Sequence, residues 1–266
     1  MQKKNTMRSR FVQRTLFVAG LIALWQLSYF LGVDVFAVWK SYAVPSPAGV
    51  LKSFLLLSSG SGLGIAMITS MRRILIGFSV SAVLGSLLGL LMTRFKYLSR
   101  NLKPLILGLQ TLPSICWVPF AILWYGLSEN AIVFIIIIGS TFAIALAAES
   151  GIRNVEPLYI RAARTMGARE SDLWIKVILP AAMPSLVAGM KQGWSFSWRS
   201  LMAGEMMFSS IGLGQILMMG RDLADINQVM VIMIIIVFIG TVIDRFIFSS
   251  WESGIRKRRG LDRDHA

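Results

Sequence analysis

The segment that decides the fold is an apolar run at residues 131–150, which reads AIVFIIIIGSTFAIALAAES. It includes four consecutive isoleucines, Ile135 to Ile138, and its first charged residue is Glu149. A helix that crosses a bilayer needs roughly 20 mostly apolar residues, because each residue advances the helix by about 1.5 Å. The run therefore predicts a transmembrane helix.

Segments of the same character lie on both sides of this run. The further expected spans are residues 11–33, 65–92, 104–127, 180–206 and 228–250. The composition agrees, since 55% of the 266 residues are hydrophobic and 15% are charged, with a mean hydropathy of +0.67. Globular domains carry roughly 25% charged residues. We expect an all-α membrane protein with about six transmembrane helices.

The basic residues predict the orientation of these helices. Nineteen Lys and Arg residues fall in the segments 3–14, 94–103, 153–176 and 256–263, whereas the opposite loops hold Lys40, Lys52 and Arg221. By the positive-inside rule, both termini and the loop at 151–179 lie in the cytoplasm. The formal net charge of +14 is then a consequence of topology, and we expect no nucleic-acid partner.

The chain lacks the residues that several function classes require. The single Cys116 and the single His265 exclude His/Cys zinc sites and an internal disulfide. No G-x-x-x-x-G-K-[ST] loop occurs, so the chain does not bind ATP through a P-loop. The loop at 151–179 is too short for a catalytic domain. We therefore expect no enzyme activity, no metal and no other cofactor, with energy supplied by another chain.

Small residues recur every fourth position in the second expected span, at Gly77, Ser81, Gly85 and Gly89. Such a stripe lets two helix backbones approach closely. Helix packing is the favoured interpretation, and lining of a pathway is the alternative.

A polar stripe marks the fifth expected span. Its members are Lys191, Ser195, Trp198, Arg199, Met202 and Glu205. Polar groups at this depth face the bundle interior or a wet cavity, because a charge in hydrocarbon costs several kcal/mol. Two interpretations stay open: a solute pathway in which Arg199 or Lys191 attracts an anion, or an ion pair between one of them and a carboxylate on another helix.

Two features of the other spans also involve polar groups in the membrane. Pro113 and Pro119 interrupt the third span and free backbone carbonyls. Such a break in a helix borders the substrate path in some transporters and is a simple kink in others. Arg72 and Arg73 lie in the outer third of the second span, where we expect both to snorkel to the interface.

A short helix is expected in the loop at 151–179. Pro157 suits a first helical position and Gly167 a C-terminal cap. Leu158, Ala162 and Met166 then form an apolar stripe at i, i+4 and i+8. Such a helix suits docking into a groove of a partner protein, or lying flat on the membrane with its arginines on anionic headgroups.

The loop resembles that of permease subunits of ATP-binding-cassette (ABC) importers, whose pattern is E-A-A-x3-G-x9-I-x-L-P. The matching residues are Ala162, Ala163, Gly167, Leu179 and Pro180. The chain departs from the pattern at Arg161, where the family has Glu, and at Val177, where it has Ile. The similarity runs from about Val44 to Arg256 and points to the nitrate/sulfonate/taurine/bicarbonate subgroup.

The resemblance implies a type I importer permease that forms the pathway for a small anion such as a sulfonate, taurine or nitrate. Bicarbonate or a vitamin precursor are alternative substrates. The implied organisation is an N-terminal tail and anchor (1–43), a permease core of five helices (44–256) and a basic tail (257–266). The implied location is the bacterial cytoplasmic (inner) membrane.

The resemblance also implies partners: two cytoplasmic ABC ATPase subunits, an external solute-binding protein, a second permease copy and membrane lipids. The residues expected to couple the chain to the ATPase are Pro157, Leu158, Arg161, Ala162, Ala163, Met166 and Gly167. A stand-alone channel or ion-gradient transporter is the alternative. Its expected sign is inverted repeats or a relay of mid-span carboxylates, but the sequence shows no such repeat, and Glu205 alone is a weak basis for a relay.

Overall fold

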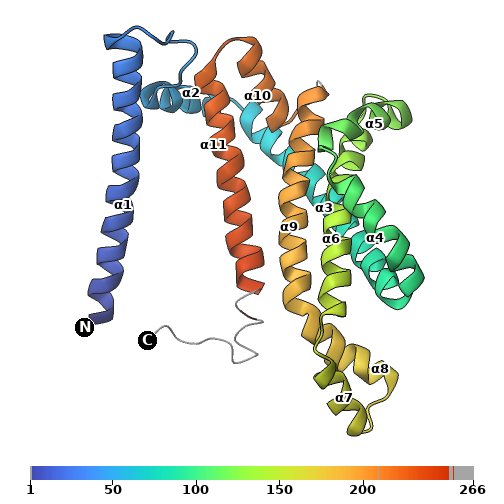
Figure 1. The fold of residues 1–266 in the computed structure, drawn as a ribbon. Helices are drawn as coiled ribbons and strands as arrows, with labels where there is room; N and C mark the ends of the chain where they lie inside the picture. Colours follow the sequence, from blue (N-terminus) through green and yellow to red (C-terminus); the bar gives the residue numbers. More distant parts are fainter. Residues whose placement is uncertain (1, 209, 252–253, 255–266) are drawn as a thin grey trace. The chain divides into compact units, whose positions relative to one another are not determined.

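The structure, a computed structural model, describes residues 2–208, 210–251 and 254, and every regular element within them is helical (Figure 1). Segments long and apolar enough to cross a membrane within this part are Thr15–Val35, Gly62–Arg94, Glu129–Arg153, Glu170–Met207 and Ile226–Trp251. If a bent pair of helices is counted as one span, the number of candidate spans rises to six. The expected all-α membrane fold is confirmed. Arg256 and the basic tail at 257–266 lie outside the described residues.

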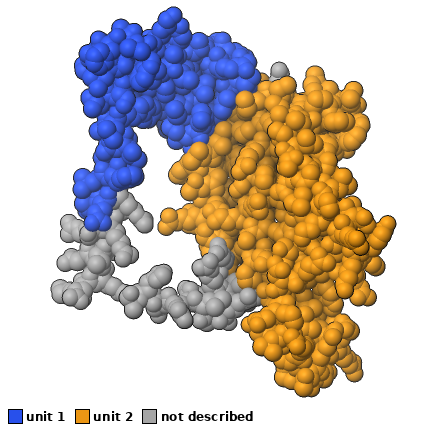
Figure 2. All heavy atoms as spheres, in the orientation of Figure 1, with its two compact units in different colours: residues 1–65, 216–235 blue, residues 66–215, 236–266 orange. Residues whose placement is uncertain are grey.

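The chain divides into two compact units (Figure 2). The smaller unit contains residues 1–65 and 216–235, and the larger contains residues 66–215 and 236–266. The division expected from the sequence, at residues 43 and 256, stays a prediction.

The smaller unit is built around α1 (Gln2–Tyr29), which a π-helical turn extends through Phe30–Val35. The Trp25 indole donates a hydrogen bond to the Pro45 carbonyl at 3.0 Å, which ties α1 to the start of α2 (Pro47–Ser59). Ser46 caps α2, because its hydroxyl accepts from the Gly49 amide. The amide of Ser46 itself donates to Asn227 at the start of α11 (Ile226–Ile243).

Three long helices form the core of the larger unit: α3 (Gly62–Arg94), α6 (Glu129–Arg153) and α9 (Leu179–Met207). Helices α6 and α9 run side by side (Figure 1). The α6 isoleucines Ile132, Ile135 and Ile136 are fully buried. Ser128 caps the N-terminus of α6 by accepting from the Ala131 amide. The apolar run that decided the fold is therefore the centre of this unit.

The third expected span, 104–127, is interrupted at one of its two prolines and begins earlier than expected. The chain instead forms α4 (Lys96–Gln110), a 3₁₀ turn (Ser114–Trp117) and α5 (Val118–Tyr125), and the two parts are bent by 102°. The break falls at Pro113, whose backbone is extended (φ −56°, ψ 141°). Pro119 causes no kink, because it occupies the first turn of α5, where its missing N–H has no partner in the helix.

Two short helical segments connect α6 to α9. They are α7 (Pro157–Thr165) and α8 (Glu170–Asp172), and a π-helical turn at Leu173–Ile178 leads from α8 into α9. After α9, a turn leads to α10 (Leu213–Asp222).

Candidate functional site

Helix α7 has the ends that the sequence predicts. Pro157 is its first residue, and Gly167 follows it with a φ of +81°. The Gly167 amide donates to the Arg164 carbonyl at 2.9 Å, and the Ala168 amide to the Ala163 carbonyl at 3.0 Å. These two bonds form a Schellman motif, which favours glycine because other residues are strained at positive φ. The length and the end of α7 are therefore fixed locally.

The two faces of α7 differ. Ala163 is buried, and Ile160 packs against the small core of Ile152, Val155 and Ala182. On the other face Leu158 is 59% and Met166 81% exposed. The remaining predicted coupling residues, Arg161 and Ala162, are exposed as well. An exposed apolar stripe beside an arginine has the character of a helix that docks into a groove.

The small-residue stripe of α3 lies against α6. A Cβ built on Gly85 would be 2.8 Å from the Thr141 carbonyl oxygen, and one on Gly89 would be 2.6 Å from that of Ala145. A Cβ on Gly77 would likewise meet the Ile136 side chain. Ser81 joins the contact by accepting a hydrogen bond from the Ser140 hydroxyl at 2.7 Å. The geometry has the features of close helix packing.

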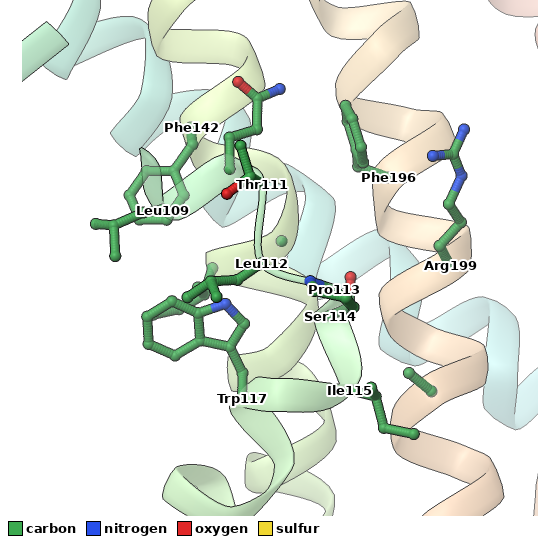
Figure 3. A pocket seen from close by; sticks show the side chains of 14 residues that line it. Leu109, Thr111, Leu112, Pro113, Ser114, Ile115, Trp117, Phe142, Phe196 and Arg199 are labelled. Atoms are coloured by element: carbon green, nitrogen blue, oxygen red, sulfur yellow. The ribbon is translucent and has the colours of Figure 1, made fainter. Parts of the chain in front are cut away.

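A cavity of about 460 Å³ lies between the break in the third span and α9 (Figure 3). Its walls come from Leu109–Trp117, Ile138, Gly139, Phe142, Phe196, Arg199 and Ala203, Cys116 excepted. Ser200 on α9 holds the break in place, because its hydroxyl donates to Ser114 at 2.9 Å.

Arg199 is the charged residue among those that line this cavity, and its side chain is exposed. Its guanidinium carbon is 5.0 Å from the centre of the Phe196 ring, a cation–π contact. Within the described residues no carboxylate lies at ion-pair distance from Arg199. A largely apolar cavity with one uncompensated cation favours a small anion over a cation.

The other members of the α9 stripe do not line this cavity. Lys191 forms an ion pair with Asp244 at 3.0 Å, which corresponds to the second of the two interpretations of the polar stripe. Trp198 is buried in an aromatic cluster with Trp194, and Glu205 is fully buried. Ser195 is exposed and Met202 half-buried.

Glu205 is the centre of a buried network near the C-terminal end of α9. Its carboxylate accepts hydrogen bonds from the Ser70 hydroxyl at 2.7 Å, from the Arg73 guanidinium at 2.9 Å and from the Gly214 amide at 3.0 Å. Arg73 also donates to the Ile211 carbonyl at 2.9 Å. The network joins α3, α9 and the turn before α10.

The expectation that Arg73 snorkels to the interface is wrong. Its side chain is 2% exposed, because Glu205 and Glu129 supply counter-charges inside the protein. Arg72, by contrast, is exposed and pairs with Glu129. The signal in the sequence is an arginine within a spanning segment, because an ionisable residue inside a membrane usually has a partner in the protein.

A second buried carboxylate, Glu149, is not among the predicted site residues. It accepts from Lys103 Nζ and from an Arg153 guanidinium nitrogen, both at 2.7 Å, and from the Ser99 hydroxyl at 3.1 Å. The sequence signal for this ion pair is the four-residue spacing of Glu149 and Arg153, which places them on one face of the same helix.

The comparisons with known proteins identify the class of this chain. Residues 81–251 match the family described as binding-protein-dependent transport system inner membrane component, and the chain belongs to this family. It is therefore a multi-pass inner-membrane permease subunit of the ABC importer class.

Relatives carry names of transport permeases. The chain is 33% identical over 226 residues to a protein of Escherichia coli (strain K12) that is named as the aliphatic sulfonates transport permease SsuC, covering 85% of this chain and 84% of that one. It is 26% identical to the nitrate import permease NrtB of Synechocystis sp. (strain ATCC 27184 / PCC 6803 / Kazusa), covering 92% and 91%.

Solved structures of ABC transporters share the fold. A structure of the inward-facing MetNI methionine ABC transporter aligns with a TM-score of 0.57 at 21% identity, covering 74% of this chain and 96% of that chain. A structure of an amino acid ABC transporter with histidines aligns at 0.63 and 15% identity, covering 75% and 97%.

Proposed function

We propose that this permease subunit, paired with a second copy of itself, forms the pathway of an ATP-driven importer for a small anion such as a sulfonate, taurine or nitrate. The observation that carries the proposal is Arg199, a cation without a carboxylate partner among the described residues, in a cavity of about 460 Å³ beside a broken helix. The names of the relatives, which include sulfonates and nitrate, support the same substrate class.

The proposed energy source is a pair of cytoplasmic ABC ATPase subunits. Each would receive one α7 helix through the exposed face of Leu158 and Met166. The Schellman cap and the packing of Ile160 make α7 a rigid attachment to α6 and α9, so a movement of the ATPase would turn the bundle as a body. The permease would then alternate between outward-open and inward-open states.

The proposed orientation places both termini and α7 in the cytoplasm, with an external solute-binding protein delivering the anion to the opposite face. The distribution of nineteen basic residues against three supports this orientation.

The test is uptake by proteoliposomes that contain the chain, its ATPase and its binding protein. We expect Arg199→Gln to reduce uptake of the anion at least tenfold and Arg199→Lys to retain part of it, because the charge is kept. Lys52→Gln, which removes an equal charge outside the cavity, is the control. Unchanged uptake by Arg199→Gln would exclude Arg199 from the pathway.

A stand-alone, gradient-driven transporter is the competing function. Its signature would be uptake by the purified chain without any ATPase, driven by an imposed ion gradient. The same liposomes also separate the substrates, since sulfonate, taurine, nitrate, bicarbonate and a vitamin precursor are offered one at a time.

A further inference from the structure

A second pocket of the larger unit, about 520 Å³, concentrates positive charge and is separate from the cavity at Arg199. It is lined by Lys96, Ser99, Arg100, Lys103, Pro104, Leu107 and Arg153, and we call it the basic pocket. Lys96, Arg100 and Lys103 follow at intervals of four and three, so they share one face of α4. Arg153 comes from the C-terminal end of α6.

The buried carboxylate of Glu149 organises this pocket. It holds Lys103 and Arg153 at 2.7 Å each, so two of the four cations are fixed in place. One carboxylate among four cations leaves the described residues of the pocket with an excess of positive charge. A folded protein tolerates such a concentration of like charge best when an anion occupies it.

The other two cations, Lys96 and Arg100, have their donors available. Both are exposed, and within the described residues neither has a carboxylate at ion-pair distance. An Arg and a Lys side by side present donors in the arrangement that binds phosphate oxygens.

The pocket is also amphipathic. Pro104, which follows Lys103 directly, and Leu107, one turn beyond it, also line the pocket, and Leu107 is 49% exposed. Beside its charged end, Phe95 is 55% and Tyr97 83% exposed. Aromatic side chains in such positions are typical of the membrane–water interface, where a helix with a basic face lies against the headgroups.

We infer that the basic pocket binds an acidic glycerophospholipid, with the headgroup phosphate on Lys96 and Arg100 and an acyl chain along Pro104 and Leu107. Inorganic phosphate offers the same oxyanion, but it makes no use of the apolar end. Basic pockets between helices near the cytoplasmic surface bind acidic lipids in other membrane proteins. This site is independent of the solute carried through the cavity at Arg199.

The test is native mass spectrometry of the full chain in detergent, titrated with phosphatidylglycerol or with phosphatidylcholine. We expect tighter binding of phosphatidylglycerol, and we expect Lys96→Gln/Arg100→Gln to weaken it about thirtyfold, because each basic residue near an acidic headgroup contributes about a fivefold factor. The control, Lys40→Gln/Lys52→Gln, removes the same charge elsewhere and should bind like the unchanged chain.

Equal binding of phosphatidylglycerol by the pocket variant and the control would overturn the inference. Displacement of the lipid by an equal concentration of inorganic phosphate would also overturn it, since the pocket would then be a phosphate site. A measurement on the unchanged chain avoids any folding defect of the variants: a photoactivatable phosphatidylglycerol should label the peptide at 95–107, and labelling confined to other segments would contradict the site.

Discussion

At the scale of single residues, Arg73 shows what a spanning helix needs in order to carry a charge. Its guanidinium is buried, yet it contacts Glu205, Glu129 and the Ile211 carbonyl. Removing one partner of a buried pair costs more than the pair itself contributes, because the other charge is left without compensation. The network therefore fixes the N-terminal part of α3 and the C-terminal end of α9 relative to each other.

Glu205→Gln should destabilise the chain. The amide keeps the shape of the side chain but removes its charge, and Glu129 alone then compensates Arg73. We expect the free energy of unfolding to fall by about 2 kcal/mol or more, measured by thermal unfolding in detergent. Glu170→Gln, which breaks an exposed pair with Arg164, should change it by under about 1 kcal/mol. Equal stability of the two variants would contradict the structural role of Glu205.

The sequence could not predict the pairing of Arg73. The carboxylate that it contacts lies 132 positions further along the chain, and three-dimensional contacts of that kind leave no local pattern. For Arg199 the sequence leaves a wet cavity and an ion pair open, and only the structure distinguishes them: Arg199 lines a cavity and has no ion pair within the described residues. Single residues are thus predictable where their physical requirement is local, and unpredictable where a distant partner meets it.

At the scale of helices, the contact of α3 with α6 depends on the absence of side chains. At Gly89 a Cβ would be 2.6 Å from the Ala145 carbonyl oxygen, a backbone atom that cannot rotate away. The stripe of small residues is predictable because its four-residue spacing follows the helix itself.

Gly89→Ala should therefore lower the free energy of unfolding by about 1–3 kcal/mol, the usual cost of overpacking. Gly64→Ala on the same helix is the matched control, because nothing lies within 4 Å of the position that its new methyl group would occupy. Its stability should stay the same or rise slightly, since alanine favours helix. Both are measured by thermal unfolding, and a loss at Gly64 equal to that at Gly89 would contradict the packing account.

Gly167→Val should weaken association with the ATPase. A β-branched residue is strained at a φ of +81°, so the Schellman cap of α7 would open. Gly167→Asn is the matched control, because asparagine tolerates positive φ. Co-purification of the ATPase should drop with Val and persist with Asn, and full recovery with Val would refute the placement of the docking helix.

The two ends of α7 are predictable because each is set by residues within a few positions of it. In the third span, Pro113 predicts the interruption but not its size. The sequence reveals neither the bend of 102° nor the hydrogen bond from Ser200 on α9 to Ser114 at the break.

At the scale of the whole molecule, the count of basic residues on each side of the spans gives a testable orientation. In a Cys116→Ser background, Thr165→Cys and Lys40→Cys place single thiols at exposed positions on opposite sides of the predicted membrane. In intact cells an impermeant maleimide should label the thiol at position 40, and the thiol at 165 only after permeabilisation. The reverse pattern would invert the topology.

The number of spans is predictable from hydropathy alone, whereas the grouping of helices is not. Residues 216–235 belong with 1–65 rather than with the helix that precedes them. One contact between these two segments is the hydrogen bond from the Ser46 amide to Asn227, across 181 positions. Hydropathy reports what lipid requires of each helix, and it carries no information on which helices pair.

The caps of α7 also bear on how such a subunit could change over generations. Because Pro157 and the Schellman turn at Gly167 define the helix from within, its outward residues are free to vary without disturbing the bundle. A replacement such as Arg161 for the family glutamate is then tolerated by the fold. Under the proposed function it would change the surface that α7 offers to the ATPase, and exchanging the exposed residues between the caps would be the way to couple this permease to a different ATPase.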